Sequence, residues 1–242
     1  MLGKLSKDEL RQRLIEAVGN HLYPLGFMWD DEGDYFFRDN GSLEWHYYTT
    51  FLDYYGDWKI SPSIGVRVKK VEEIFHKTSG FEKADQRFGC TVGCSVRDYV
   101  EKFLPDCAIE RTFDCEIQKR GDIAKSAEFL CELFDTFAMP FFEKYLDLHE
   151  IDHALNDYPD NLRILGAAMY SERMGMIVAK ILNRKDYDEL VQKYSKELKA
   201  RANGFYLPGF EALVLYLKEN PPNAGSELLP DSGGNDVRCG GK

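Results

Sequence analysis

Hydrophobic residues recur at every fourth position near the start of the chain, at Leu10, Leu14, Val18 and Leu22. This spacing places them on one face of a helix. Ser6 and Glu9 fit the capping box that begins many helices, in which each residue satisfies a backbone N–H of the other. Pro24 would interrupt a continuing helix. The pattern therefore predicts an amphipathic helix that ends before Pro24.

Aromatic and β-branched stretches follow this helix. In chain order they read "YFFR", "LEWHYYTTFLDYY" and "WKISPSIGVRVKK". The sequence "DNGS" separates the first two, and Asn40-Gly41 is a strong hairpin signal because both residues tolerate positive φ. Such compositions are typical of strands joined by tight turns.

Two further stretches alternate between polar and apolar residues, as strands with one buried face do. "CTVGCSV" would place four residues on one face, namely Cys90, Val92, Cys94 and Val96. "IERTFDCEI" would do the same with Ile109, Phe113, Cys115 and Ile117. Together with the aromatic stretches they predict an antiparallel sheet of about five strands.

From Asp122 onward the hydrophobic spacing becomes helical. The first apolar stripe consists of Ala127, Leu130, Cys131, Phe134, Phe137 and Ala138. Pro140 is expected to kink or end this helix, because proline lacks the backbone N–H that a helix interior needs. Further helices are predicted near residues 147–156, 161–183, 186–202 and 208–219, the last with Pro208 in its first turn.

The expected fold is a single α+β domain over residues 1–219. It comprises an N-terminal helix, an antiparallel sheet of about five strands backed by the long helix, and a helical C-terminal half. The sheet-containing part spans residues 1–158 and the helical part residues 159–219. Residues 220–242 are rich in Pro, Gly and Ser and are expected to form a disordered tail.

Composition and charge indicate the cellular location and the class of partner that we expect for this chain. Its 242 residues are 44% hydrophobic, enough to bury a core without disulfides. The N-terminus lacks the apolar stretch of a secretory signal, and no later run approaches the roughly 18 residues of a membrane helix. We therefore expect a cytoplasmic protein with no membrane partner. The formal charge of −10 disfavours nucleic acid and favours a basic partner, although solubility alone also accounts for it.

Residues 149–153 read His-Glu-Ile-Asp-His and fit HExxH, the zinc signature of many metallopeptidases. In that chemistry, His149 and His153 would bind one metal ion and Glu150 would activate its bound water.

Helix-start signals explain the same segment without a metal. Asp147 fits an N-cap, and Glu150 then occupies the third helical position of a capping box. An apolar stripe at Leu148, Ile151 and Leu155 would leave His149, Asp152 and His153 facing away from the core. We therefore expect a short surface helix with no catalytic residue, metal or other cofactor, and a zinc-dependent hydrolase is the alternative.

The six cysteines have an irregular spacing that matches no zinc pattern, and most are interpreted as small core residues. Cys90 and Cys94 would lie about 13 Å apart in a strand, too far to form a disulfide or share a metal. A core position is therefore expected for both.

Residues 23–58 have the most unusual composition in the chain. They contain 13 aromatics, including all three tryptophans, and eight acidic residues against the single basic residue Arg38. One interpretation is that Leu43, Trp45, Tyr47 and Phe51 face the core while the acidic residues keep the hairpins soluble. The other is a binding surface on the opposite face and turn, made of Glu44, His46, Tyr48, Asp53, Tyr54, Tyr55, Asp57 and Trp58. Exposed aromatics among negative charges would suit a basic protein partner.

Four motifs carry a resemblance to a known family: "LGF" after the first helix, "YFFR", "SIGV" and "AMPFFEKYL". Together they resemble the bacterial domain-of-unknown-function family 4304 over about residues 8–200, although strand 43–55 is richer in tyrosine than in that family. Such families are similar in character to immunity proteins, which are small acidic α+β proteins that block a bacterial toxin. The resemblance thus implies a non-enzymatic protein-binding module, for example one that neutralises a basic toxin, and identifies no catalytic residues.

Overall fold

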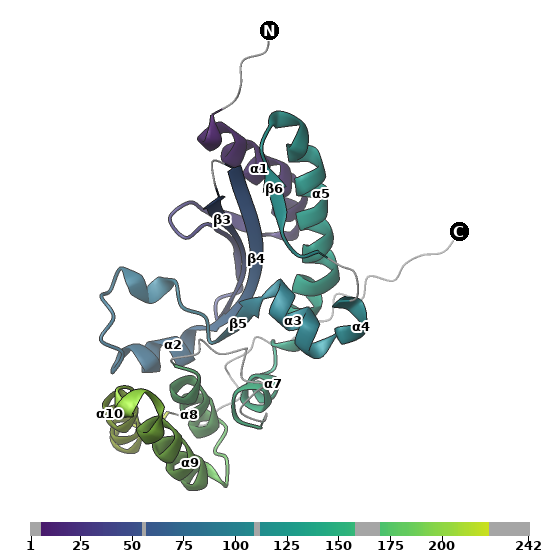
Figure 1. The fold of residues 1–242 in the computed structure, drawn as a ribbon. Coiled ribbons are helices and arrows are strands. Elements are labelled where there is room, and N and C mark those ends of the chain that lie inside the picture. The colour runs from purple at the N-terminus through teal and green to yellow at the C-terminus, as the bar shows by residue number, and fades with distance from the viewer. Residues whose placement is uncertain (1–5, 55–56, 109–111, 158–169, 223–242) are drawn as a thin grey trace.

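The computed structural model describes residues 6–54, 57–108, 112–157 and 170–222. A curved antiparallel sheet carries helices on one face, and a group of helices from the C-terminal part of the chain lies at one end of it (Figure 1). The fold is therefore α+β, as predicted. Within the described ranges, no helix has both the length and the apolar character needed to cross a membrane.

The first helix, α1 (Lys7–Leu22), begins as its sequence predicts. The Ser6 hydroxyl accepts a hydrogen bond from the Glu9 N–H (3.2 Å), and the Glu9 carboxylate accepts one from the Ser6 N–H (2.7 Å). The predicted stripe of leucines and valine is buried against the rest of the core. A short 3-10 helix, η1 (Tyr23–Leu25), follows and ends at Gly26, whose φ of 83° suits glycine.

The sheet contains six strands in the described residues. They are β1 (Met28–Asp30), β2 (Tyr35–Asp39), β3 (Leu43–Tyr54), β4 (Asp57–Val68), β5 (Val92–Ser95) and β6 (Cys115–Ile117). The first five are neighbours in chain order, and β6 pairs with β4 beyond the end of β5. All pairs are antiparallel, which confirms the predicted sheet.

The β2–β3 turn forms where Asn40-Gly41 predicts it. Gly41 has a φ of 96°, and the Asn40 side chain accepts hydrogen bonds from the N–H groups of Ser42 and Leu43. This turn fixes the register of β3, because alternate residues must then face opposite sides of the sheet. Leu43, Trp45 and Tyr47 are buried on the core face, as predicted, and Phe51 packs against the same core.

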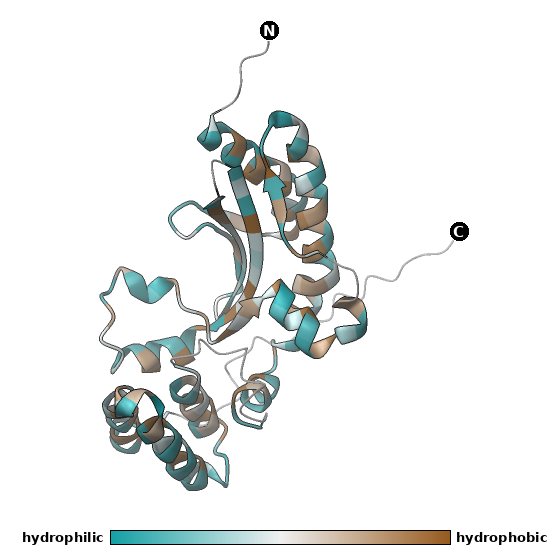
Figure 2. Cartoon of the chain, viewed as in Figure 1, coloured by the Kyte–Doolittle hydropathy of each residue, from teal (hydrophilic) through white to brown (hydrophobic). Residues whose placement is uncertain are grey.

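The long helix that backs the sheet continues past Pro140. Helix α5 (Ile123–Leu133) runs through a π-helical turn (Phe134–Ala138) into α6 (Met139–Lys144). Pro140 is the second residue of α6, a position where the missing N–H costs little. In place of the expected kink or end, the π-helical turn lies directly before α6. Figure 2 shows hydrophobic positions on β4 and α5, where the sheet and helix layers meet.

Several short elements were not predicted. They are α2 (Lys69–His76), η2 (Asp85–Arg87), α3 (Val96–Phe103), α4 (Pro105–Ala108) and η3 (Arg120–Asp122). The strand expected over residues 90–96 is shorter, because the Ser95 hydroxyl caps α3 and turns Val96 into its first residue. The strand expected over residues 109–117 is reduced to β6, and Ile109 lies outside the described residues.

The C-terminal half is helical, as predicted. It contains α7 (Leu148–Asp152), a π-helical turn (His153–Asp157), α8 (Ser171–Ile181), α9 (Tyr187–Ala200), the 3-10 helix η7 (Arg201–Gly204) and α10 (Leu207–Glu219). Its last helices enclose a second hydrophobic cluster of Met176, Ala179, Leu190, Tyr194, Leu198 and Phe210. Much of the helix predicted from residue 161 and most of the predicted tail lie outside the described residues.

Candidate functional site

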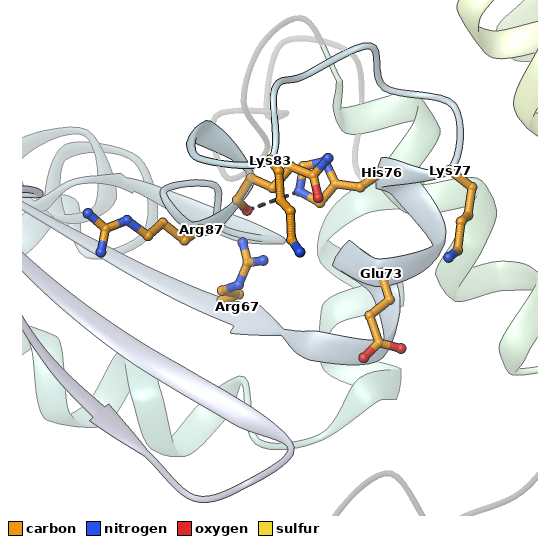
Figure 3. A pocket seen from close by; sticks show the side chains of 7 residues that line it. Arg67, Glu73, His76, Lys77, Lys83 and Arg87 are labelled. Carbon is orange, nitrogen blue, oxygen red and sulfur yellow. Dashed lines mark hydrogen bonds between the residues drawn. The ribbon is translucent and has the colours of Figure 1, made fainter.

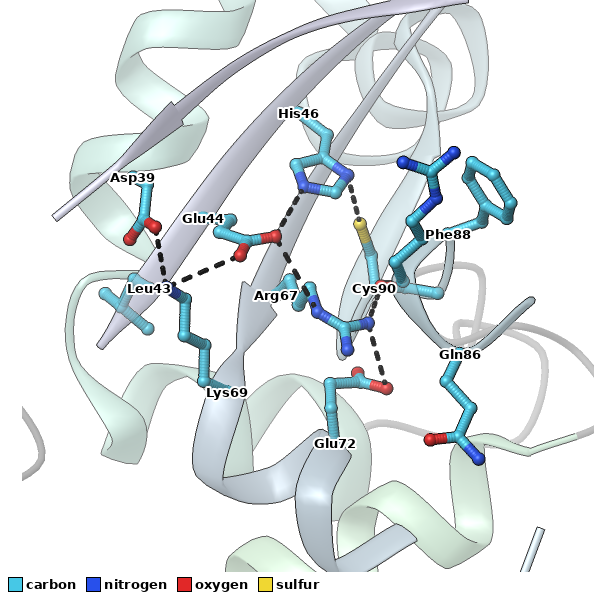
Figure 4. Close-up of polar contacts among 12 residues, drawn as sticks. Asp39, Leu43, Glu44, His46, Arg67, Lys69, Glu72, Gln86, Phe88 and Cys90 are labelled. Atoms are coloured by element: carbon cyan, nitrogen blue, oxygen red, sulfur yellow. Dashed lines mark hydrogen bonds and ion pairs between the residues drawn. The ribbon is translucent and has the colours of Figure 1, made fainter. Parts of the chain in front are cut away.

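The face of the sheet opposite the core carries a cluster of ionisable side chains (Figure 4). Glu44 and His46 alternate with the core residues of β3, so period-two geometry places both on this second face. The β3–β4 register sets Arg67 directly opposite Glu44. Cys90 comes from the segment before β5 and meets them there. We call Glu44, His46, Tyr48, Arg67, Glu72 and Cys90 the His46 cluster.

His46 is the centre of this cluster and is fully buried, with 0% of its surface exposed. Its Nε2 lies 3.2 Å from Glu44 Oε2, and its Nδ1 lies 2.9 Å from the Tyr48 hydroxyl and 3.4 Å from Cys90 Sγ. The Tyr35 ring stacks on the imidazole with centroids 4.4 Å apart. Both ring nitrogens therefore have polar partners, as a buried histidine requires.

The charges around His46 favour its protonated form. Burial acts to lower the pKa of His46, but Cys90 and Glu44 outweigh it and raise that pKa to about 9. The hydrogen bond with His46 in turn lowers the pKa of Glu44, helped by Arg67 and Lys69. Near neutral pH, His46 and Glu44 form an imidazolium–carboxylate pair.

Glu72 is a second buried carboxylate, contributed by α2, and is 1% exposed. One of its oxygens accepts a hydrogen bond from the Thr91 hydroxyl (2.8 Å). The other lies 3.5 Å from Arg67 Nη1 and has no hydrogen-bond partner among the described residues. Burial raises the pKa of Glu72, which the nearby Arg67 charge opposes. Arg67 thus lies between Glu44 and Glu72, and its Nη1 also donates to the Gly89 carbonyl (2.7 Å).

Arg67 also lines a cavity of about 480 Å³ between α2 and the segment that follows it. The lining residues of this cationic pocket are Arg67, Glu73, His76, Lys77, Lys83, Gln86 and Arg87. Figure 3 shows Arg67, Lys83 and His76 turned toward the same space, with Arg87 and Lys77 at its sides. Four cations and one carboxylate therefore surround a cavity in a chain whose formal charge is −10.

The cations of this pocket differ in how their charge is compensated. Arg87 pairs with Asp30 (3.6 Å) and Glu32. No ion pair with an acidic side chain of the described ranges is found for Lys77 or Lys83. Burial lowers the pKa of His76, whose ring nitrogens lie 3.0 Å from Ser79 Oγ and from the Gln86 carbonyl. The pocket thus has two uncompensated cations beside a neutral imidazole.

Three of the residues proposed as a binding surface lie within the His46 cluster. Glu44, His46 and Tyr48 are brought together, but the expectation that His46 is exposed is wrong. The segment carrying Phe88 and Cys90 approaches this part of the sheet, and the Tyr48 hydroxyl donates to the Phe88 carbonyl (3.2 Å). These side chains are therefore engaged inside the protein.

The remaining proposed binding residues lie at the other end of the β3–β4 hairpin. Asp53 is exposed and pairs with Lys7 (2.6 Å), and Asp57 is half-buried. Trp58 is also half-buried, and its indole N–H donates to the Lys7 carbonyl (3.1 Å). Tyr55 and the side chain of Tyr54 lie outside the described residues. The eight residues therefore form two separate groups, and binding of a basic protein by them stays a prediction.

The HExxH segment forms the short helix α7 that its capping signals predict. The Asp147 carboxylate accepts a hydrogen bond from the His149 N–H (2.8 Å), which confirms the N-cap. His149 and His153 are exposed, and His153 Nδ1 lies 3.1 Å from Asp157. Glu150 is 3.7 Å from Lys144. Across the described ranges, no group of three or more His, Cys, Asp or Glu side chains is arranged to hold a metal.

Asp152 corrects one detail of this prediction. It was expected on the surface, but it is buried and lies 2.9 Å from Arg184 Nη1. The helix widens into a π-helical turn after Asp152 and contacts α8, which brings this face of α7 inward.

Cys90 corrects a second prediction. Cys94 packs against the core, as expected, whereas Cys90 lies beside His46 on the opposite face. Strand β5 begins only at Val92, so the alternation read from the sequence does not extend back to Cys90. The sequence predicted neither the contact between Cys90 and His46 nor the cationic pocket. The position of Arg67 opposite Glu44 could have been predicted, because a hairpin turn after Tyr54 sets that register.

Comparisons with protein-family models, curated proteins and solved structures found no match to this chain. The resemblance to family 4304 therefore rests on the sequence motifs alone.

Proposed function

We propose that this chain is a binding protein for a small organic phosphate, which enters the cationic pocket. The observation that carries this proposal is the gathering of Arg67, Lys77, Lys83 and Arg87 around one cavity in an acidic chain. A volume of about 480 Å³ lies within the range of about 300–1,000 Å³ that is common for small-molecule sites. Like charges held close together repel, and an anion between them would relieve that repulsion.

Arg67 is suited to hold a phosphate because its position is fixed from behind. Contacts with Glu44, Glu72 and the Gly89 carbonyl hold the guanidinium in place. Among the described residues, no partner is found for its Nη2, so this group remains available to a ligand. A pre-oriented guanidinium loses little freedom when it binds an oxyanion, and its planar donors match phosphate geometry.

The other lining residues favour a phosphate attached to an organic body. Lys83 and Lys77 supply mobile positive charges that can follow phosphate oxygens. Glu73 and Gln86 can form hydrogen bonds with hydroxyl or amino groups of the remaining part of the ligand. A single inorganic phosphate would leave much of the cavity unfilled.

Titration calorimetry at low salt tests the proposal with inorganic phosphate, pyrophosphate and adenosine triphosphate as probes. We expect adenosine triphosphate to bind most tightly and Lys83→Glu to weaken its binding at least about 10-fold, equivalent to about 1.4 kcal/mol. The matched control is Lys196→Glu on α9, an exposed lysine outside the pocket with the same change of charge. Its affinity should stay within about twofold of wild type.

Two results would contradict this function. Absence of binding by all three probes would remove the pocket as an organic-phosphate site. Equal weakening by Lys83→Glu and Lys196→Glu would show that only the overall charge of the protein attracts the probes.

The two functions considered from the sequence are different proposals. An immunity-type role needs a basic protein partner, and a zinc-dependent hydrolase needs a metal held by His149 and His153. No specific observation in the described residues favours either one over the cationic pocket.

A further inference from the structure

Cys90 differs from the other cysteines that the structure describes. Burial raises the pKa of Cys94 to about 12 and that of Cys115 and Cys131 to about 11, which leaves these thiols unreactive at neutral pH. Cys107 is exposed on the short helix α4. Cys90 is partly exposed and has a histidine within hydrogen-bonding distance.

The residues around Cys90 form a thiol–imidazole–carboxylate series. Cys90 Sγ lies 3.4 Å from His46 Nδ1, and His46 Nε2 lies 3.2 Å from Glu44 Oε2. In such a series the imidazolium stabilises a thiolate beside it, and the carboxylate stabilises the imidazolium in turn. Arg67 (3.7 Å) and Lys69 (3.5 Å) hold Glu44 from its other side. These contacts therefore hold the carboxylate end of the series, Glu44, in place.

Two neighbours complete the setting of the sulfur. The Tyr48 hydroxyl lies 3.3 Å from Cys90 Sγ, and its single proton can turn from the Phe88 carbonyl (3.2 Å) to a thiolate. Gly65 lies beneath the sulfur, and a Cβ there would come within 2.6 Å of Sγ. Any side chain at position 65 would push the sulfur away from His46.

We propose that Cys90 is a nucleophilic thiolate that is oxidised by small hydroperoxides. The reagent is a small one because access to the Cys90 sulfur is limited. Cys90 is only partly exposed, and it lines neither the cationic pocket nor the smaller cavity beside β6. A small peroxide can reach such a sulfur more readily than a bulky acyl substrate. The inference does not rest on the binding of an organic phosphate.

The reaction is a two-electron transfer from sulfur to the peroxide. The Cys90 thiolate attacks the terminal oxygen of R–O–O–H, so that an S–O bond forms as the O–O bond breaks. The electron pair of the broken bond leaves with RO⁻, which takes the proton held by His46 and departs as R–OH. The product is the sulfenic acid Cys90–S–OH. Two equivalents of an added thiol reduce it to Cys90–SH, with release of one disulfide and one water.

The test measures sulfenic acid at each cysteine of the full chain. The protein is treated with stoichiometric hydrogen peroxide in the presence of dimedone, which traps sulfenic acids, and labelled peptides are quantified by mass spectrometry. At pH 7 we expect Cys90 to be labelled at least about 10-fold faster than Cys107. Cys94, Cys115 and Cys131 should stay unlabelled. A rate at Cys90 equal to or below that at Cys107 in the folded wild-type protein would overturn the proposal.

Variants distinguish activation of Cys90 by its neighbours from reactivity that is due to exposure of the sulfur alone. Tyr48→Phe keeps the ring but removes the hydroxyl, and we expect it to slow labelling of Cys90 several-fold. His46→Asn should slow it at least about 10-fold, because the sulfur loses the imidazolium beside it. Labelling of Cys107 serves as the internal control in each variant and should not change. If His46→Asn folds by near-ultraviolet circular dichroism and reacts at the wild-type rate, the role of the series is disproved.

Discussion

At the scale of single residues, His46 links protonation to the stability of the fold. Its folded-state pKa of about 9 lies above the value of 6.5 for an unperturbed histidine. A raised pKa means that the folded state binds the proton more tightly than the unfolded state. This contribution to stability is therefore complete below about pH 6.5 and is lost as the pH rises through about 9.

His46 alone would contribute a fall of up to about 3 kcal/mol between pH 7 and pH 9.5, at 1.36 kcal/mol per unit of pKa difference. A Cys90 thiolate releases its proton on folding, which offsets the proton that His46 takes up until the thiol of the unfolded chain titrates at about pH 8.5. We therefore predict that wild-type stability falls by about 1 kcal/mol, chiefly between pH 8.5 and pH 9.5. Urea denaturation at a series of pH values measures this change. His46→Asn lacks the titrating group, so its stability should change less over the same interval. Equal slopes for the two proteins would assign the effect to other groups.

Residue-scale features were predictable where their causes are local in sequence. The Ser6–Glu9 capping box and the Asn40-Gly41 turn each depend on side chains within three residues of each other, and both are confirmed. The contact between His46 and Cys90 joins positions 44 residues apart. It depends on the path of the segment before β5, which no local pattern specifies.

At the scale of secondary-structure elements, α7 tests how much one cap stabilises a short helix. Asp147→Ala should destabilise the protein by about 1 kcal/mol, because the His149 N–H would lose its carboxylate partner. Glu150→Gln should change stability by less than about 0.5 kcal/mol, since its contact with Lys144 is an exposed one at 3.7 Å. Chemical denaturation of both variants measures the difference. A larger effect at Glu150 would contradict the capping interpretation.

The missed elements show where hydrophobic spacing is ambiguous. The stretch ending "GVRVKKVEEIF" changes from a strand period to a helical period between Val68 and Val71, with two lysines between them. Those lysines fit either element, so the predicted strand includes Lys69 and Lys70, and no element is predicted for the rest of α2. The cationic pocket was missed with it, because α2 contributes Glu73 and His76 to the lining.

At the scale of the whole molecule, a buried asparagine connects α7 and its π-helical turn to the last helices. Asn156 donates to the carboxylate of Asp152 (2.5 Å) and to the Gly175 carbonyl (3.0 Å), and it accepts from the Tyr194 hydroxyl (2.8 Å). Tyr194 belongs to the second hydrophobic cluster. These contacts couple the C-terminal helices to the larger core.

Asn156→Ala should destabilise the protein by about 2–4 kcal/mol, because it leaves a cavity and removes the acceptor to which the buried Tyr194 hydroxyl donates. All three tryptophans lie in residues 29–58, so their fluorescence reports on the sheet, whereas far-ultraviolet circular dichroism reports on all helices. In urea, we expect the helical signal of this variant to decrease before the fluorescence changes. The exposed Gln192→Ala on α9 is the control and should unfold like wild type. Coincident transitions in Asn156→Ala would argue against this coupling.

The strand order has a consequence for folding during synthesis. Because β1 to β4 are neighbours in both chain and sheet, their pairing closes only short loops, and the loss of chain entropy at each step is small. Part of their core face, however, is covered by α5 and α6, which end at Lys144. At about 5–20 residues per second, a ribosome would need roughly 4 to 15 s to translate from Val68 to Lys144. During that interval an apolar sheet face would be open to chaperones and to other nascent chains.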